Sequence, residues 1–151
     1  MTRPEDELES RVRERLAYIF KRLHLDLHEL HEQVLAPFGI SAGELAVLML
    51  IDEREPESQQ QVAERLGVDR TTMVSLIDAL ETGGLVARRP DPRDRRRNVI
   101  ELTQAGAETL RRATDASDEA ERRLLTALTQ AEAAQLRTLL GRVVGVSEPG
   151  T

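Results

Sequence analysis

The feature that most constrains the fold of this chain is one interruption in an otherwise helical pattern of apolar residues. Between Gly84 and Thr103 the pattern changes to two short β-prone runs, residues 85–87 and 99–102. The polar stretch 88–98 separates these runs, which is typical of a β-hairpin with a long charged tip. Elsewhere the apolar residues recur at steps of three and four, the spacing of one helix face. The sequence therefore predicts a mainly α-helical fold with one small β-hairpin.

Side chains that can cap helices mark where five of the helices begin. Each offers an oxygen to backbone N–H groups that the first turn leaves free. In three cases a Glu or Gln follows three residues later and completes a capping box. With one Tyr and two Phe in 151 residues, the core must be built from aliphatic side chains, which favours helix-on-helix packing. The predicted caps are Ser41, Ser58, Asp69, Thr103 and Thr129.

The first segment predicts one long helix over residues 4–36, since it contains no Gly and no Pro beyond Pro4. A 30-residue helix is already about 45 Å long, and a domain of this size cannot cover so long an apolar stripe. We therefore expect part of the stripe to pack on a second copy of the chain. Residues 1–37 and 104–146 would supply dimerisation helices around a central domain of residues 38–103. We expect residues 147–151 to be a disordered tail.

Two consecutive helices, predicted over 58–66 and 69–82, are joined by a turn containing Gly67, as in a helix-turn-helix. The second helix of this motif lies in the major groove of DNA, with its N-terminal residues at the base edges. There Arg70 could bind guanine, while Met73 and Ile77 lie on the opposite, buried face. The alternative is an amphipathic surface helix without a ligand. The residues assigned to DNA on these helices are Ser58, Gln59, Gln60, Arg70, Thr71, Thr72 and Ser75.

The charge is distributed unevenly. The whole chain has a net charge of −6, yet residues 88–97 hold six arginines and two aspartates, a local net charge of +4. A basic patch on an acidic body is the electrostatic footprint of a nucleic-acid-binding protein, and a solvated run of charges is the alternative. We expect Asp94 to hold one of the arginines and so fix the shape of the tip. The residues assigned to DNA here are Arg88, Arg89, Arg93, Asp94, Arg95, Arg96 and Arg97.

Three segments, residues 69–72, 80–96 and 102–106, together resemble the signature of the MarR family. The resemblance covers roughly residues 40–110, and Asp94 with Arg96 matches the Asp-x-Arg element of its wing. It implies a winged helix-turn-helix over 38–103, flanked by long dimerisation helices that entwine in a homodimer on double-stranded, pseudo-palindromic DNA. It also implies a ligand crevice between the dimerisation and DNA-binding parts. Ala79 stands where relatives often have a basic residue, so one phosphate contact is expected to be missing.

The three histidines of the chain, His24, His28 and His31, share one face of the first predicted helix. They could bind a metal or sense pH or a ligand, and the alternative is that they are half-buried polar residues beside the dimer interface. We assign no metal and no cofactor. Together with Tyr18 they are instead the candidate effector site, for a small phenolic or anionic compound.

Other classes of protein are disfavoured. The sequence contains no Ser-His-Asp arrangement and no glycine-rich phosphate loop, so we expect no enzyme. It contains no cysteine, no apolar run of membrane-spanning length and no leader peptide, so we expect a cytoplasmic protein. The predicted function is a homodimeric, sequence-specific transcription regulator, a repressor relieved by a small ligand. The alternative is a constitutive winged-helix module used for architecture or for a protein contact.

Overall fold

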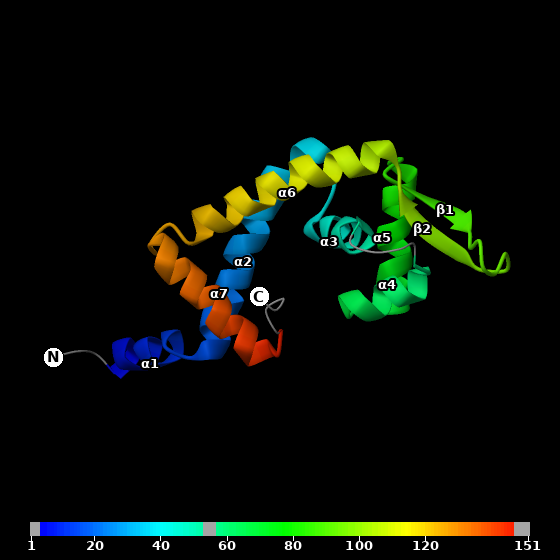
Figure 1. Ribbon diagram of the computed structural model, residues 1–151. Coiled ribbons are helices and arrows are strands. Elements are labelled where there is room, and N and C mark those ends of the chain that lie inside the picture. Colours follow the sequence, from blue (N-terminus) through cyan, green and yellow to red (C-terminus); the bar gives the residue numbers. More distant parts are fainter. Residues whose placement is uncertain (1–3, 53–56, 147–151) are drawn as a thin grey trace.

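The computed structural model describes residues 4–52 and 57–146, and the expected tail at 147–151 lies outside these residues. Figure 1 shows a long arm of helices beside a smaller lobe that ends in a β-hairpin. The predicted fold class, mainly α with one hairpin wing, is confirmed. In chain order the elements are α1 (Pro4–Arg13), α2 (Leu16–Leu35), the 3-10 turn η1 (Ala36–Phe38), α3 (Ala42–Asp52), α4 (Gln59–Leu66), α5 (Arg70–Thr82), β1 (Val86–Pro90), β2 (Asn98–Leu102), α6 (Gln104–Leu124) and α7 (Gln130–Val144).

The predicted caps are present at the starts of five helices. Ser58 and Thr129 each form a capping box with the residue three positions later. Ser41 and Glu44 exchange the same pair of hydrogen bonds at the start of α3. Asp69 and Thr103 accept from backbone N–H groups of α5 and α6, so all five predicted caps are confirmed. Local sequence therefore fixes where these helices begin.

The prediction of one continuous helix over residues 4–36 is wrong. The backbone of Arg15 is extended (φ −74°, ψ 135°), so α1 ends at Arg13 and a new helix begins at Leu16. Figure 1 shows α1 turning away from the axis of α2. Val12 and Leu16 beside the break are exposed, at 48% and 69%. Because short helices depend on packing for most of their stability, the exposed residues beside the break do not hold this stretch in one continuous helix.

A short turn separates the last two helices. α6 ends at Leu124, and the chain turns over residues 125–128. Thr129 has the extended backbone of an N-cap (φ −68°, ψ 163°), so the chain must leave the helix before that residue. The turn brings α7 back along the arm (Figure 1).

The hydrophobic core includes residues of the lobe and of the end of the arm beside it. Leu48 on α3, Met73 and Ile77 on α5 and Ile100 on β2 are buried, and Leu35 at the end of α2 belongs to the same cluster. Small buried residues on α6, among them alanines, let that helix pack closely against α2. The lobe and the arm are thus connected through shared packing.

The hairpin differs from its prediction. β1 and β2 pair antiparallel from Val86 opposite Leu102 to Pro90 opposite Asn98, so the first strand runs to residue 90 and the tip is only 91–97. Two arginine side chains, Arg88 and Arg89, fit on β1 because each pairs with a carboxylate. Arg89 contacts Glu101 at 3.0 Å, and Arg88 contacts α5. Two of the six arginines assigned to the tip therefore lie on a strand.

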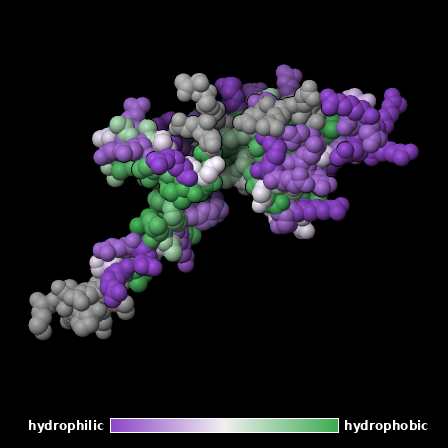
Figure 2. All heavy atoms as spheres, turned by 60° about the horizontal axis from the view of Figure 1, so that its bottom comes forward, coloured by the Kyte–Doolittle hydropathy of each residue, from purple (hydrophilic) through white to green (hydrophobic). Residues whose placement is uncertain are grey.

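The far end of the arm exposes apolar surface. Leu16 on α2 is 69% exposed and Val143 on α7 is 77% exposed. Figure 2 shows hydrophobic residues gathered along the arm and hydrophilic ones over the lobe with the hairpin. Among the described residues no single helix is long and apolar enough to span a membrane, and one bent pair, 16–38 with 42–52, passes by length and composition alone.

Candidate nucleic-acid interface

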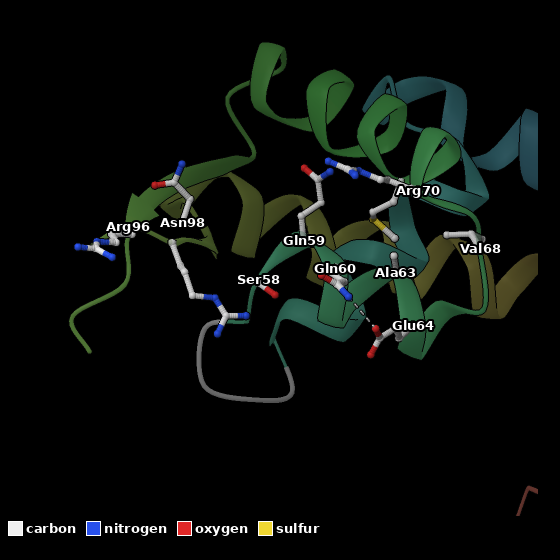
Figure 3. A pocket seen from close by; sticks show the side chains of 11 residues that line it. Ser58, Gln59, Gln60, Ala63, Glu64, Val68, Arg70, Arg96 and Asn98 are labelled. Atoms are coloured by element: carbon white, nitrogen blue, oxygen red, sulfur yellow. Dashed lines mark hydrogen bonds between the residues drawn. The ribbon is translucent and has the colours of Figure 1, made fainter. Parts of the chain in front are cut away.

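A groove of about 730 Å³ lies between the two helices of the helix-turn-helix and the hairpin. Its walls come from the start of α4, the start of α5 and the last residues of the hairpin tip. Figure 3 shows Gln59 and Arg70 reaching toward one another from α4 and α5, with Arg96 and Asn98 on the hairpin side. The lining residues are Ser58, Gln59, Gln60, Ala63, Glu64, Val68, Arg70, Met73, Arg96, Arg97 and Asn98.

The start of α5 is fixed by Asp69. Its Oδ1 accepts from the backbone N–H of Thr72 at 2.8 Å, and its Oδ2 accepts from the Thr72 hydroxyl at 2.8 Å. The backbone hydrogen bond and then the hydroxyl hydrogen bond hold the pKa of the Asp69 carboxyl below its ordinary value. The Thr72 hydroxyl, assigned to DNA from the sequence, therefore belongs to the helix cap in this structure. Arg70, Thr71 and Ser75 are exposed.

The start of α4 adds amide side chains to the groove. Ser58 is the helix cap, with its Oγ accepting from the N–H of Gln61 at 3.3 Å. Gln60 donates to Glu64 Oε1 at 3.2 Å, and Gln59 lines the groove beside it. Sequence reasoning missed Glu64, although its position four residues after Gln60 was a usable signal. A carboxylate here can accept a hydrogen bond from the N4 amine of cytosine.

The hairpin tip is braced by its own main chain. Asp94 Oδ1 accepts from the backbone N–H of Arg96 at 3.0 Å, and the Asp94 carbonyl accepts from the N–H of Arg97 at 2.9 Å. Asp91 accepts from the N–H of Arg93 at 2.9 Å. Asp94 was expected to brace an arginine side chain, and these hydrogen bonds show it fixing the loop through backbone amides. The exposed arginines at the tip are Arg93, Arg95, Arg96 and Arg97.

Arg88 pairs with two carboxylates inside the lobe. Its guanidinium contacts Asp78 Oδ1 at 2.6 Å and also the carboxylate of Glu81, both on α5. The hydrogen bond to Asp78 is the main cause that raises the pKa of Arg88 above its ordinary value. The side chain is only 27% exposed, so Arg88 ties the hairpin to the recognition helix rather than facing solvent at the tip. Sequence reasoning missed Asp78 and Glu81 as its partners.

Comparison with known proteins identifies the family. Residues 40–97 match the model of the MarR family. The chain is 31% identical to the HTH-type transcriptional regulator PecS of Dickeya dadantii over 125 residues, which are 81% of this chain and 75% of PecS. The chain belongs to the MarR family.

Solved structures of other MarR-family regulators share the fold. The transcriptional repressor CouR bound to a 23-mer DNA duplex has a TM-score of 0.82 and 31% identity, with 95% of this chain and 99% of that chain covered. CouR from Rhodococcus jostii RHA1 bound to p-coumaroyl-CoA has a TM-score of 0.76 and 27% identity, with 92% and 98% covered. The winged helix-turn-helix fold expected from the MarR resemblance is thus confirmed.

The four candidate effector residues of this MarR-family chain do not line one shared pocket. His24 lines an apolar hollow of about 290 Å³ between α2, α6 and α7. His28 stacks on His24 with 6.3 Å between ring centroids and contacts Glu32 at 3.5 Å. His31 is hydrogen-bonded to Ser117 on α6, and Tyr18 lies in a separate hollow with residues of α1. Within residues 4–52 and 57–146, no group of three or more His, Cys, Asp or Glu residues could hold a metal ion.

Proposed function

We propose that this MarR-family chain is a homodimeric transcription regulator that binds a pseudo-palindromic, double-stranded operator. The observation that carries the proposal is the groove between α4, α5 and the hairpin, which Arg70, Arg96 and Arg97 line on an otherwise acidic protein. Exposed guanidinium groups suit phosphates and base edges. We expect the protein to act in the cytoplasm, where its DNA lies, and to catalyse no reaction.

The two parts of the interface have different roles in this proposal. The start of α5 enters the major groove, where Arg70, Thr71 and Ser75 meet base edges. The hairpin tip lies over the phosphate backbone and the minor groove, where Arg95 and its neighbours meet the high negative potential. The hydrogen bonds within residues 91–97 support this assignment, because a preorganised loop loses less entropy when it binds.

The exposed apolar surface of the arm supports a homodimer. Figure 1 shows the start of α2 and the end of α7 at the same end of the arm. Leu16, Ile19 and Phe20 near the start of α2 and Val143 near the end of α7 are exposed. Surfaces of this kind mark association sites, and a second copy with the same surface can cover it around a two-fold axis. In this proposal residues 1–37 and 104–146 form the dimer, and residues 38–103 bind DNA.

A small ligand relieves repression in this proposal. The CouR relative was solved with p-coumaroyl-CoA, and here an apolar hollow lies on the arm that carries the DNA-binding lobes. His24 supplies a polar edge to that hollow, as a phenolic or anionic compound requires. A ligand that binds one spacing of the two lobes better than another shifts operator affinity by that difference.

Selection from a random duplex library tests the proposal. We expect enrichment of an inverted repeat whose half-site centres are about 10 base pairs apart. We also expect the selected duplex to bind at least about 10³-fold more tightly than a shuffled one. Enrichment of no common sequence contradicts operator binding. Sequence-selective binding that no ligand alters supports the constitutive module instead.

A further inference from the structure

One guanidinium connects three elements of the DNA-binding lobe. Arg88 on β1 contacts Asp78 and Glu81 on α5, and its Nη2 atom also donates to Oε1 of Gln59 on α4 at 3.3 Å. Gln59 lines the groove proposed to face DNA, whereas Arg88 does not. The contact therefore runs from inside the lobe to a side chain at the interface.

The chemistry of the guanidinium decides how the Gln59 amide is turned. A free glutamine amide can rotate and offer either its oxygen as an acceptor or its NH₂ group as a donor. A guanidinium has only donors, so the oxygen of Gln59 must face Arg88. The NH₂ group then faces away from Arg88. In the part of the chain that the structure describes, this NH₂ group donates to no protein acceptor.

The clamp that holds Arg88 does not depend on Gln59. Asp78 and Glu81 are three residues apart on α5 and therefore lie on one helix face, where both carboxylates meet the guanidinium. Arg88 is opposite Ile100 in the hairpin register, and Ile100 is fully buried, so the backbone at this point is anchored to the core. Arg88 is thus fixed before DNA arrives and can orient the Gln59 side chain.

We infer that Arg88 is a positioning residue that presents Gln59 to DNA as a hydrogen-bond donor. This inference rests on the proposed function. The partner of Gln59 is then an acceptor on DNA: O6 or N7 of guanine, N7 of adenine, O4 of thymine, or a phosphate oxygen. The orientation excludes the exocyclic amines of cytosine and adenine as partners, because these groups are themselves donors.

A double-mutant cycle tests the inference, with affinities measured on the selected operator. Gln59→Ala in the wild-type background should weaken binding about tenfold, the low end for one base contact. In the Arg88→Met background the same change should weaken binding less than about threefold, because Gln59 is no longer oriented. Gln60→Ala is the matched control, since Gln60 lines the same groove but contacts Glu64. Its factor should be the same in both backgrounds.

A second, independent variant is Gln59→Glu. This change keeps an acceptor for Arg88 and so preserves the fold, but it removes the NH₂ donor of Gln59. We expect a loss of operator affinity larger than that of Gln60→Glu, which adds the same charge to the same helix. Thermal unfolding of both variants should match the wild type within a few degrees. This variant carries the test if Arg88→Met does not fold.

The outcomes distinguish a DNA base from a phosphate as the acceptor of Gln59. They also distinguish failure of this inference from failure of the proposed function. A Gln59→Ala loss confined to the operator indicates a base, and an equal loss on a shuffled duplex indicates a phosphate. Equal Gln59→Ala factors in the wild-type and Arg88→Met backgrounds overturn the inference alone, as does a Gln59→Glu variant that binds as well as Gln60→Glu. Absence of sequence-selective binding by the wild-type protein overturns the proposed function as well.

Discussion

The Nε2 atom of His31 on α2 lies 3.0 Å from the Oγ atom of Ser117 on α6. Ser117 is the one buried polar residue among the described residues, so this hydrogen bond satisfies a hydroxyl that would otherwise be unpaired between the two helices. Burial is the main cause that lowers the pKa of His31, the nearby Glu121 carboxylate opposes that shift, and His28 adds to it. The contact between α2 and α6 at this point therefore depends on the protonation state of His31.

Lowering the pH should loosen this contact. Because the pKa of His31 in the folded protein is below its ordinary value of 6.5, the unfolded chain binds a proton first as the pH falls. The stabilising contribution is complete above about pH 7 and is lost as the pH falls through 6.5 toward the folded pKa. Denaturant unfolding between about pH 7 and 5 should show a smaller loss of stability in His31→Gln than in the wild type. If His31→Gln and His24→Gln lose stability equally, His31 is not the cause.

Gly106 should tolerate no side chain. A Cβ atom at this position would lie 1.9 Å from the backbone oxygen of Leu85, which also accepts the hydrogen bond from the N–H of Thr103. Gly106→Ala should therefore lower the free energy of unfolding by about 1–3 kcal/mol or more, because backbone must move. Gly141→Ala is the control, since its nearest atom is 3.5 Å away and the helix gains up to about 1 kcal/mol. Chemical denaturation measures both, and equal stabilities would contradict the predicted close approach.

Mutations in the recognition helix and in the hairpin tip should change DNA binding in different ways. Arg70→Ala should reduce operator affinity by about 1–3 kcal/mol and relax specificity at one position of each half-site. Arg97→Ala should weaken binding to all duplexes and reduce the log–log salt slope by about one unit for each lost contact, hence about two per dimer. Fluorescence anisotropy at several salt concentrations measures both effects. Equal losses of specificity would refute this division.

His24 should be needed for the ligand response. With phenol and benzoate as probes, one phenolic and one anionic, we expect a five- to 150-fold change in operator affinity, the usual range of coupling between two sites. His24→Ala should reduce this change because the side chain lines the apolar hollow. Glu29→Ala, an exposed change on the same helix, is the control. If neither probe changes the affinity of the wild type, this prediction fails and constitutive binding is favoured.

The helix boundaries were predictable because their signals are local. Ser58, Asp69 and Thr129 cap the helices that immediately follow them. The break at Arg15 was not predictable, since no Gly or Pro marks it and the apolar stripe continues through it. A helix without core contacts can bend wherever packing is absent.

The candidate site was predictable in position and less so in detail. The sequence assigned both Arg70 and the arginines of the hairpin to DNA, and the groove joins α5 to that hairpin. It could not show that Arg88 is paired with Asp78 and Glu81, because these pairs depend on how the hairpin packs on α5. Nor could it show that Thr72 serves the cap, since a hydroxyl near a helix start suits either role.

The central claim is that two copies of this chain place two recognition helices on one face of DNA. Hydroxyl-radical footprinting of the selected duplex, at a protein concentration that saturates it, tests that claim most directly. We predict two protected segments on each strand with centres about 10 base pairs apart, at a measured ratio of two chains per duplex. A single protected half-site at one chain per duplex would contradict the account.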